Sequence, residues 1–158
     1  MTNWLGILYN SFWLGCAACG FGLLFQVAKK NLAVVWIGGA VAGLVKYTIL
    51  NMSDTSPLIA SSFCSAMVVG LICLLFGIWR KEPAMIFAIP SVIPLIPGVY
   101  AYHTMLGLIK LAGKLSDNYS SIVSQTIHDG ATTLFITISI AIGVGIPLRV
   151  SIGIQRLG

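Results

Sequence analysis

Long stretches without a formal charge dominate this sequence. The first runs from Trp4 to Val27, the second from Leu32 to Leu50 with Lys46 as its only charge, and the third from Leu58 to Trp79. A helix needs about 20 mostly apolar residues to cross a bilayer, so each run is long enough. Only 8% of the 158 residues are charged, whereas an average soluble domain has about 25%. The sequence therefore predicts an all-α integral membrane protein and excludes most soluble enzymes.

Two further apolar stretches follow, and both depart from a simple spanning helix. Residues 84–112 contain three prolines, and residues 120–150 are longer than a bilayer requires. No linker is long enough to separate domains, and no segment is of low complexity. We therefore expect a single transmembrane domain over residues 1–158, with about five spans at the following positions: 4–27, 32–50, 58–79, 84–112 and 120–150.

The basic residues predict an orientation. They give the chain a formal net charge of +5, but they occur in ones and twos, whereas a nucleic-acid binder carries a basic patch. Lys and Arg in short loops mark the cytoplasmic side of a membrane protein, which places Lys29, Lys30, Arg80 and Lys81 inside and the N-terminus outside. Whether residues 84–112 cross or re-enter, six basic residues lie inside against two outside. The length of this segment favours a crossing, so we expect the C-terminus inside.

The fourth stretch contains the most informative feature of the chain. Pro90, Pro94 and Pro97 lie within eight residues and are followed by Gly98. Each proline removes a backbone donor and crowds the carbonyl four residues earlier. Gly98 permits a tight turn, after which a second half-helix would begin with free N–H groups at residues 99–101. Helix starts favour anions, and discontinuous helices form substrate sites in secondary transporters. A proline-kinked structural helix is the alternative.

A family resemblance is carried by the same segment. The heptapeptide Val92–Gly98, with Tyr102 and Met105 after it, resembles the signature of the threonine/serine exporter (ThrE) superfamily, and most closely that of its small, YjjB-like subunit. Further elements resemble the family in order and spacing: Gly20–Gln26, Lys29–Lys30, Gly38–Gly39, a basic residue at Lys46, and Gly145–Pro147.

The resemblance implies a function and a partner. It implies a multi-pass exporter in the bacterial inner membrane for small carboxylate-bearing metabolites, with threonine, serine or succinate as substrates. It also implies a two-component assembly with a larger hydrophobic subunit, in which this chain contacts only lipid, partner and substrate, without a cofactor. A non-transporting scaffold that stabilises the larger subunit is the alternative. An enzyme using His128 and Asp129 is disfavoured, because no His-Glu-x-x-His or Gly-x-Ser-x-Gly motif is present.

Six residues are candidates for substrate binding at the expected break. Five lie in or just after it, and Lys46 comes from the second span. As an ionisable group inside a span, Lys46 is a functional candidate: it would hold a substrate carboxylate or would only extend its ammonium to the interface. The candidates are Pro94, Pro97, Gly98, Val99, Tyr102 and Lys46.

Asp129 is the candidate for coupling transport to protons. It lies beside a polar stripe of the last span, at three- and four-residue steps, formed by Ser121, Gln125, His128, Thr132, Ser139 and Gly143. A carboxylate there could take up protons, or it could be solvated near the interface at a helix start. The acid departs from the family pattern, so the resemblance does not imply its role. No Cys or His group has ligand spacing, and we expect no metal site.

Overall fold

The structure is a computed structural model that describes residues 4–52, 58–113 and 119–155, with side chains as far as residue 150. In the described part all regular structure is helical, which confirms the predicted fold class. The elements are α1 (Trp4–Leu24), η1 (Lys29–Asn31), α2 (Leu32–Met52), α3 (Leu58–Arg80), α4 (Met85–Val92), η2 (Ile93–Leu95), α5 (Gly98–Ala112) and α6 (Tyr119–Gln155).

Among the described residues, four helices are long and apolar enough to cross a membrane, and a bent pair makes up to five. The pair consists of residues 85–95 and α5, which meet at an angle of 58°. The break therefore falls in the proline-rich segment, as the sequence predicts. The helix α6 has 37 residues, or about 55 Å at 1.5 Å per residue, which exceeds the roughly 30 Å hydrocarbon core of a bilayer.

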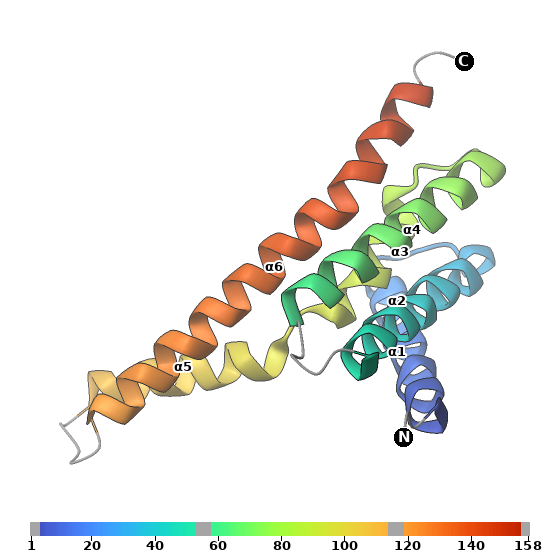
Figure 1. Ribbon diagram of the computed structural model, residues 1–158. Coiled ribbons are helices and arrows are strands. Elements are labelled where there is room, and N and C mark those ends of the chain that lie inside the picture. The colour runs from blue at the N-terminus through green and yellow to red at the C-terminus, as the bar shows by residue number, and fades with distance from the viewer. Residues whose placement is uncertain (1–3, 53–57, 114–118, 156–158) are drawn as a thin grey trace.

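Helices α1 to α4 form a bundle in which small residues allow close contact (Figure 1). A Cβ atom added at Gly43 would lie 2.8 Å from the Cα of Ser11, and one at Gly39 would lie 3.0 Å from the Leu14 carbonyl oxygen. Helices can approach this closely only where side chains are small. These contacts join α1 and α2. Helix α4 packs against both of them, and its Phe87 is fully buried.

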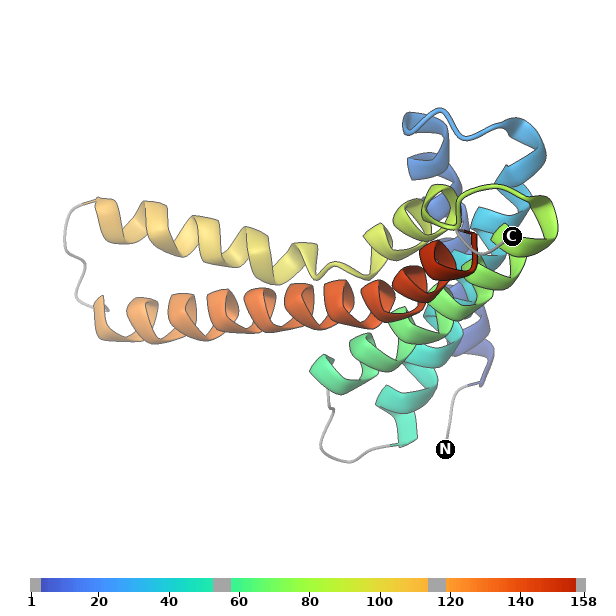
Figure 2. The ribbon, with the colours of Figure 1, turned by 90° about the horizontal axis from the view of Figure 1, so that it is seen from above.

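Helices α5 and α6 form a hairpin that extends away from the bundle (Figure 2). We call α5 together with residues 119–132 of α6 the arm. Gly107 is the one buried residue of α5, and a Cβ there would lie 2.9 Å from the Cβ of Thr126 on α6. The second half of α6 returns to the bundle along α3. A Cβ added at Gly143 would lie 2.8 Å from the Phe63 carbonyl oxygen.

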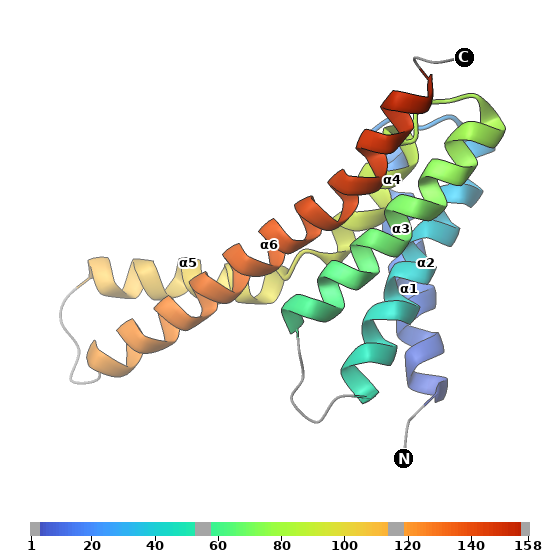
Figure 3. The same cartoon turned by 45° about the horizontal axis from the view of Figure 1, so that its top comes forward.

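One end of the bundle gathers the connections rich in basic residues. The C-terminal end of α6, the α1–α2 connection and the α3–α4 turn all lie there (Figure 3). Lys30 Nζ lies 2.8 Å from Glu82 Oε1, and Asn31 Nδ2 donates a hydrogen bond to Glu82 Oε2. The hydrogen bond from Lys30, helped by that from Asn31, holds the pKa of Glu82 below its ordinary value. Glu82 thus fastens the α1–α2 connection to the α3–α4 turn.

Candidate functional site

The break between α4 and α5 is built by a turn at Pro97. After the short 3-10 helix η2, Ile96 is extended, and Pro97 has φ −79° and ψ 72°. These angles are those of an inverse γ-turn, which the Gly98 N–H closes by donating to the Ile96 carbonyl oxygen at 2.9 Å. The turn therefore falls at Gly98, where the sequence indicated one, and the fixed φ of proline suits the central position of the turn. Gly98 is also the first residue of α5.

The start of α5 offers two backbone donors. The Ala101 N–H donates to the Pro97 carbonyl oxygen at 3.2 Å, and the Gly98 N–H is used in the turn. The N–H groups of Val99 and Tyr100 have no acceptor in the part of the chain that the structure describes. Two free amides therefore remain where the sequence predicted three, since the first helical hydrogen bond takes the third. No atom lies within 4 Å of a Cβ added at Gly98, so this helix start is open.

Lys46 reaches the break from α2. Its Nζ donates a hydrogen bond to the Leu95 carbonyl oxygen at 3.2 Å. In a continuous helix this carbonyl would accept from the N–H of Val99, and the turn at Pro97 removes that bond. The ammonium therefore compensates a carbonyl that lipid could not satisfy. An ammonium has three donors, so Lys46 retains hydrogen-bonding capacity beyond Leu95.

A groove lies where the arm leaves the bundle. Its volume is about 610 Å³, within the range of roughly 300–1,000 Å³ that is usual for small-molecule sites. One wall is apolar and comes from the start of α3, and the other is more polar and comes from α5 and α6. The lining residues are Leu58, Ile59, Ala60, Phe63, Tyr100, His128, Thr132 and Ser139.

The sequence anticipated part of this groove. The polar stripe of the last span already contained His128, Thr132 and Ser139, and the structure brings them to α3, where Ser139 Oγ donates to the Ile59 carbonyl oxygen at 3.1 Å. The Tyr100 side chain was missed. Nothing in the sequence separates Tyr100 from Tyr102, because only the tertiary packing decides which tyrosine faces α6. Tyr102 is 62% exposed instead.

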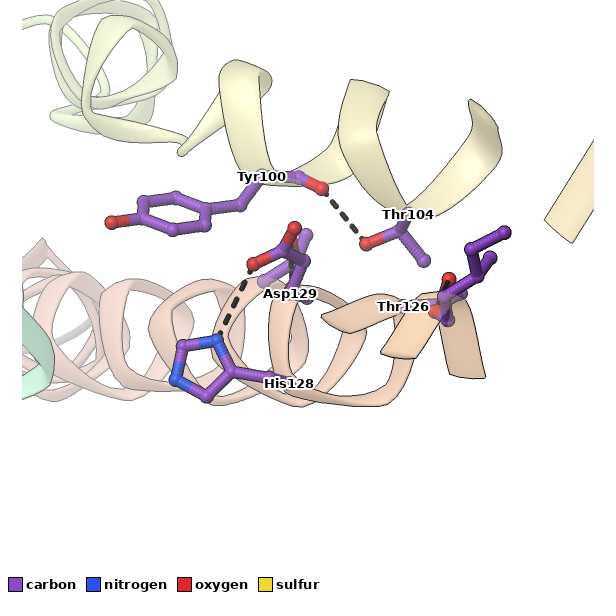
Figure 4. A network of polar contacts seen from close by, with 7 residues as sticks. Tyr100, Thr104, Thr126, His128 and Asp129 are labelled. Carbon is purple, nitrogen blue, oxygen red and sulfur yellow. Dashed lines mark hydrogen bonds and ion pairs between the residues drawn. The ribbon is translucent and has the colours of Figure 1, made fainter. Parts of the chain in front are cut away.

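Asp129 is buried inside the arm, not solvated at an interface. It is 7% exposed, and its carboxylate points towards α5, whereas His128 lies on the other side of α6 (Figure 4). His128 Nδ1 lies 3.3 Å from Asp129 Oδ1. A small cavity of about 140 Å³ adjoins the carboxylate and is lined by His103, Leu106, Gly107, Lys110, Ile122, Gln125, Thr126 and Asp129.

The structure does not gather all the predicted site residues in one cavity. Lys46 contacts the break at the Leu95 carbonyl oxygen, and Pro97 forms the turn two residues further along the chain. Val99 is 68% exposed at the start of α5, and Pro94 is half-buried in η2. None of the six predicted substrate residues lines the groove or the cavity beside Asp129. Among the described residues, no group of three or more His, Cys, Asp or Glu side chains could hold a metal ion.

Comparisons with known proteins match nearly the whole chain. The family model described as "Threonine/Serine exporter, ThrE" matches residues 10–150. An uncharacterised protein of Haemophilus influenzae is 26% identical over 144 residues, which cover 90% of this chain and 47% of that protein. The chain thus spans about half the length of this curated relative. No solved structure matches.

Proposed function

This chain belongs to the threonine/serine exporter family, and we propose that it is the small subunit of a two-component secondary exporter for small carboxylate-bearing metabolites. Threonine, serine and succinate are the substrates we propose, and alternating access is the mode of transport. Membership of the family, together with the apolar helices, makes the chain a component of a membrane transporter. The substrate, the subunit role and the bacterial inner membrane are parts of the proposal.

The break between η2 and α5 is the observation that carries the proposal. The amides of Val99 and Tyr100 point out of the start of a 15-residue helix, where the helix dipole places partial positive charge. The Lys46 ammonium lies at the same break, on the Leu95 carbonyl oxygen. A carboxylate is the group that threonine, serine and succinate share, and these donors suit it. The open space at Gly98 gives a ligand access to them.

The groove next to the break supplies the rest of the proposed site. Tyr100 belongs to both, because its N–H is free at the helix start and its side chain lines the groove. Tyr100, His128 and Thr132 would contact the polar part of the substrate that distinguishes one metabolite from another. The apolar wall from α3 would limit its size. A substrate bound at the junction of α3, α5 and α6 would contact the bundle and the arm at once. Binding and release of the substrate would therefore be coupled to movement of the arm.

We propose Asp129 as the proton-coupling residue. Its carboxylate is buried within the arm and lies 3.3 Å from His128, which also lines the groove. A proton on Asp129 would therefore be linked to the state of the substrate groove through one neighbouring side chain. In the Asp129→Asn variant we expect efflux driven by a pH gradient to fall at least tenfold while substrate exchange without a gradient persists. Equal loss of both activities would contradict coupling through Asp129.

Two observations support the proposed assembly and orientation. The Haemophilus relative is about twice as long as this chain, and its unmatched length is sufficient for a second membrane unit such as the larger subunit that we propose. The end of α6 lies beside the connections that carry Lys29, Lys30, Arg80 and Lys81. A common cytoplasmic side for these segments corresponds to five crossings, with the N-terminus outside. A reporter that is active only in the cytoplasm should then give a signal when it is attached after α6. A signal from a reporter that is active only in the periplasm would contradict this topology.

The proposed function is tested by efflux. Cells loaded with threonine, serine or succinate should release at least one of these metabolites several-fold faster when this chain and its partner are both present than when either is deleted. Reintroducing the chain should restore the rate. Identical efflux of all three metabolites with and without the chain would contradict the proposal.

A further inference from the structure

We propose that the arm is the surface through which this chain packs against the membrane domain of the larger subunit. The identity of the partner rests on the proposed function, whereas the need for a protein partner follows from the surface of the arm itself. That surface suits neither lipid nor water.

The arm has little contact with the rest of the described chain. Its helix α5 packs chiefly on α6, beyond the edge of the bundle (Figure 2). All other residues of α5 besides Gly107 are at least partly exposed. Two helices that cover only one another leave most of their surface to be covered by something else.

Large apolar side chains occupy much of this surface. Five residues of α5 and one of α6 are each between 55% and 68% exposed: Val99, Tyr102, Met105, Leu108, Ile109 and Ile127. If the arm extended into water, these side chains would form an exposed apolar patch. Such patches mark binding sites for protein or membrane. Water alone is therefore a poor environment for the arm.

Polar side chains share the same arm. His103, Lys110 and Gln125 are exposed around the small cavity beside Asp129, and Ser124 is exposed as well. His128 lines the groove, and its side chain is 74% exposed. If the arm lay in lipid, these groups would lose their hydrogen bonds to water without gaining others, which is costly. Polar and ionisable groups inside a membrane face the protein interior or a water-filled cavity.

The exposed side of helix α3 is a comparison within the same chain, although its Ile59 and Ala60 also line the groove. Its exposed residues are all apolar or weakly polar: Ile59, Ala60, Cys64, Leu71, Leu75, Ile78 and Trp79. The arm differs because it combines apolar side chains with imidazole, ammonium and amide groups. Helix–helix interfaces in membranes combine these features, since packing and interhelical hydrogen bonds drive association there.

The length of the relative identifies the kind of partner. More than half of the Haemophilus protein lies outside the matched region, and that length is sufficient for a second membrane domain. A membrane domain of this size is what the larger subunit of the proposed exporter would offer to the arm. We therefore commit to that subunit as the occupant of the arm surface, and not to a second copy of this chain.

Photo-crosslinking in native membranes tests the proposal. A benzophenone amino acid is placed at Met105 or Ile127 on the arm, and at Leu75 of α3 as a matched control. The three residues have similar exposure, at 63%, 66% and 65%. The full-length chain is expressed in the organism that makes it, irradiated, and analysed by mass spectrometry. We expect adducts at Met105 and Ile127 with a single larger membrane protein of the exporter family, at least tenfold above the level at Leu75.

Three results would overturn the proposal. The first is the absence of protein adducts at both arm positions, which would leave the arm to lipid. The second is an adduct only with another copy of this chain, and the third is equal capture of the larger protein at Leu75. Efflux measured in the same strains tests the proposed function separately. Arm adducts without any dependence of efflux on the chain would refute the exporter role and retain the interface, and efflux without arm adducts would refute the interface alone.

Discussion

At the scale of single residues, Lys46 has a structural role beside the functional one that we propose. Its ammonium pairs with the Leu95 carbonyl oxygen that the break leaves without a helical donor. Leu95 is followed, across the turn at Pro97, by the helix start whose Val99 and Tyr100 amides are free. A substrate carboxylate at this place would join an existing hydrogen-bonded group and would not meet an isolated cation.

Lys46→Met should therefore lower stability and transport together. A buried acceptor left unpaired costs about 1–3 kcal/mol, and we expect a lower thermal unfolding temperature in detergent and a several-fold higher half-saturating substrate concentration for efflux. Lys29→Met is the control, because Lys29 is exposed at a loop. Wild-type stability in Lys46→Met would show that the Leu95 carbonyl does not depend on this ammonium.

Glu82 predicts a dependence of stability on pH. Hydrogen bonds from Lys30 and Asn31 lower the pKa of its carboxyl group from the ordinary value of 4.5. A carboxyl group with a lowered pKa in the folded state stabilises that state above the unfolded pKa, and the contribution is lost as the pH falls through the folded pKa. As the pH is lowered below about 4.5, we expect the thermal unfolding temperature to decrease more steeply in the wild type than in Glu82→Gln. Parallel curves would contradict the role of this carboxylate.

At the scale of elements, the break and the arm are the two features that distinguish this chain from a plain helical bundle. Hydropathy and the spacing of the prolines were sufficient to predict the helices and the interruption of the fourth. The prolines and Gly98 also indicated where the second half-helix begins, whereas the type of turn, with Pro97 at its centre, was not predictable. The burial of Asp129 depends on Gly107 allowing α5 to approach α6, and the sequence does not reveal which helices pair.

Gly107→Ala tests the packing of the arm. A Cβ at this position would lie 2.9 Å from the Cβ of Thr126 and 3.0 Å from its Cγ2, so the helices must separate or Thr126 must move. Overpacking of this kind costs about 1–3 kcal/mol. We expect Gly107→Ala to lower the thermal unfolding temperature, whereas Gly20→Ala, which meets no atom within 4 Å, should not. Equal stability of the two variants would mean that α5 and α6 do not approach as described.

At the scale of the whole molecule, one chain supplies a bundle, a broken helix and an arm that the bundle does not cover. The apolar runs allowed the membrane class and about five spans to be predicted from sequence, and the described residues contain four to five. The groove could not be predicted, because its walls come from three segments that are distant in sequence and meet only where the arm leaves the bundle. The mixed surface of the arm is a property of the folded hairpin for the same reason.

The central claim is that substrate binds in this chain at the open start of α5, and a pair of glycine variants tests it most directly. Gly98 and Gly20 both have open space around the position of a Cβ, so Gly98→Phe and Gly20→Phe add the same bulk at two positions that are alike in this respect. Efflux of threonine, serine and succinate is measured at matched expression. We predict at least a tenfold loss of efflux in Gly98→Phe and wild-type rates in Gly20→Phe. Wild-type efflux in Gly98→Phe would contradict the claim.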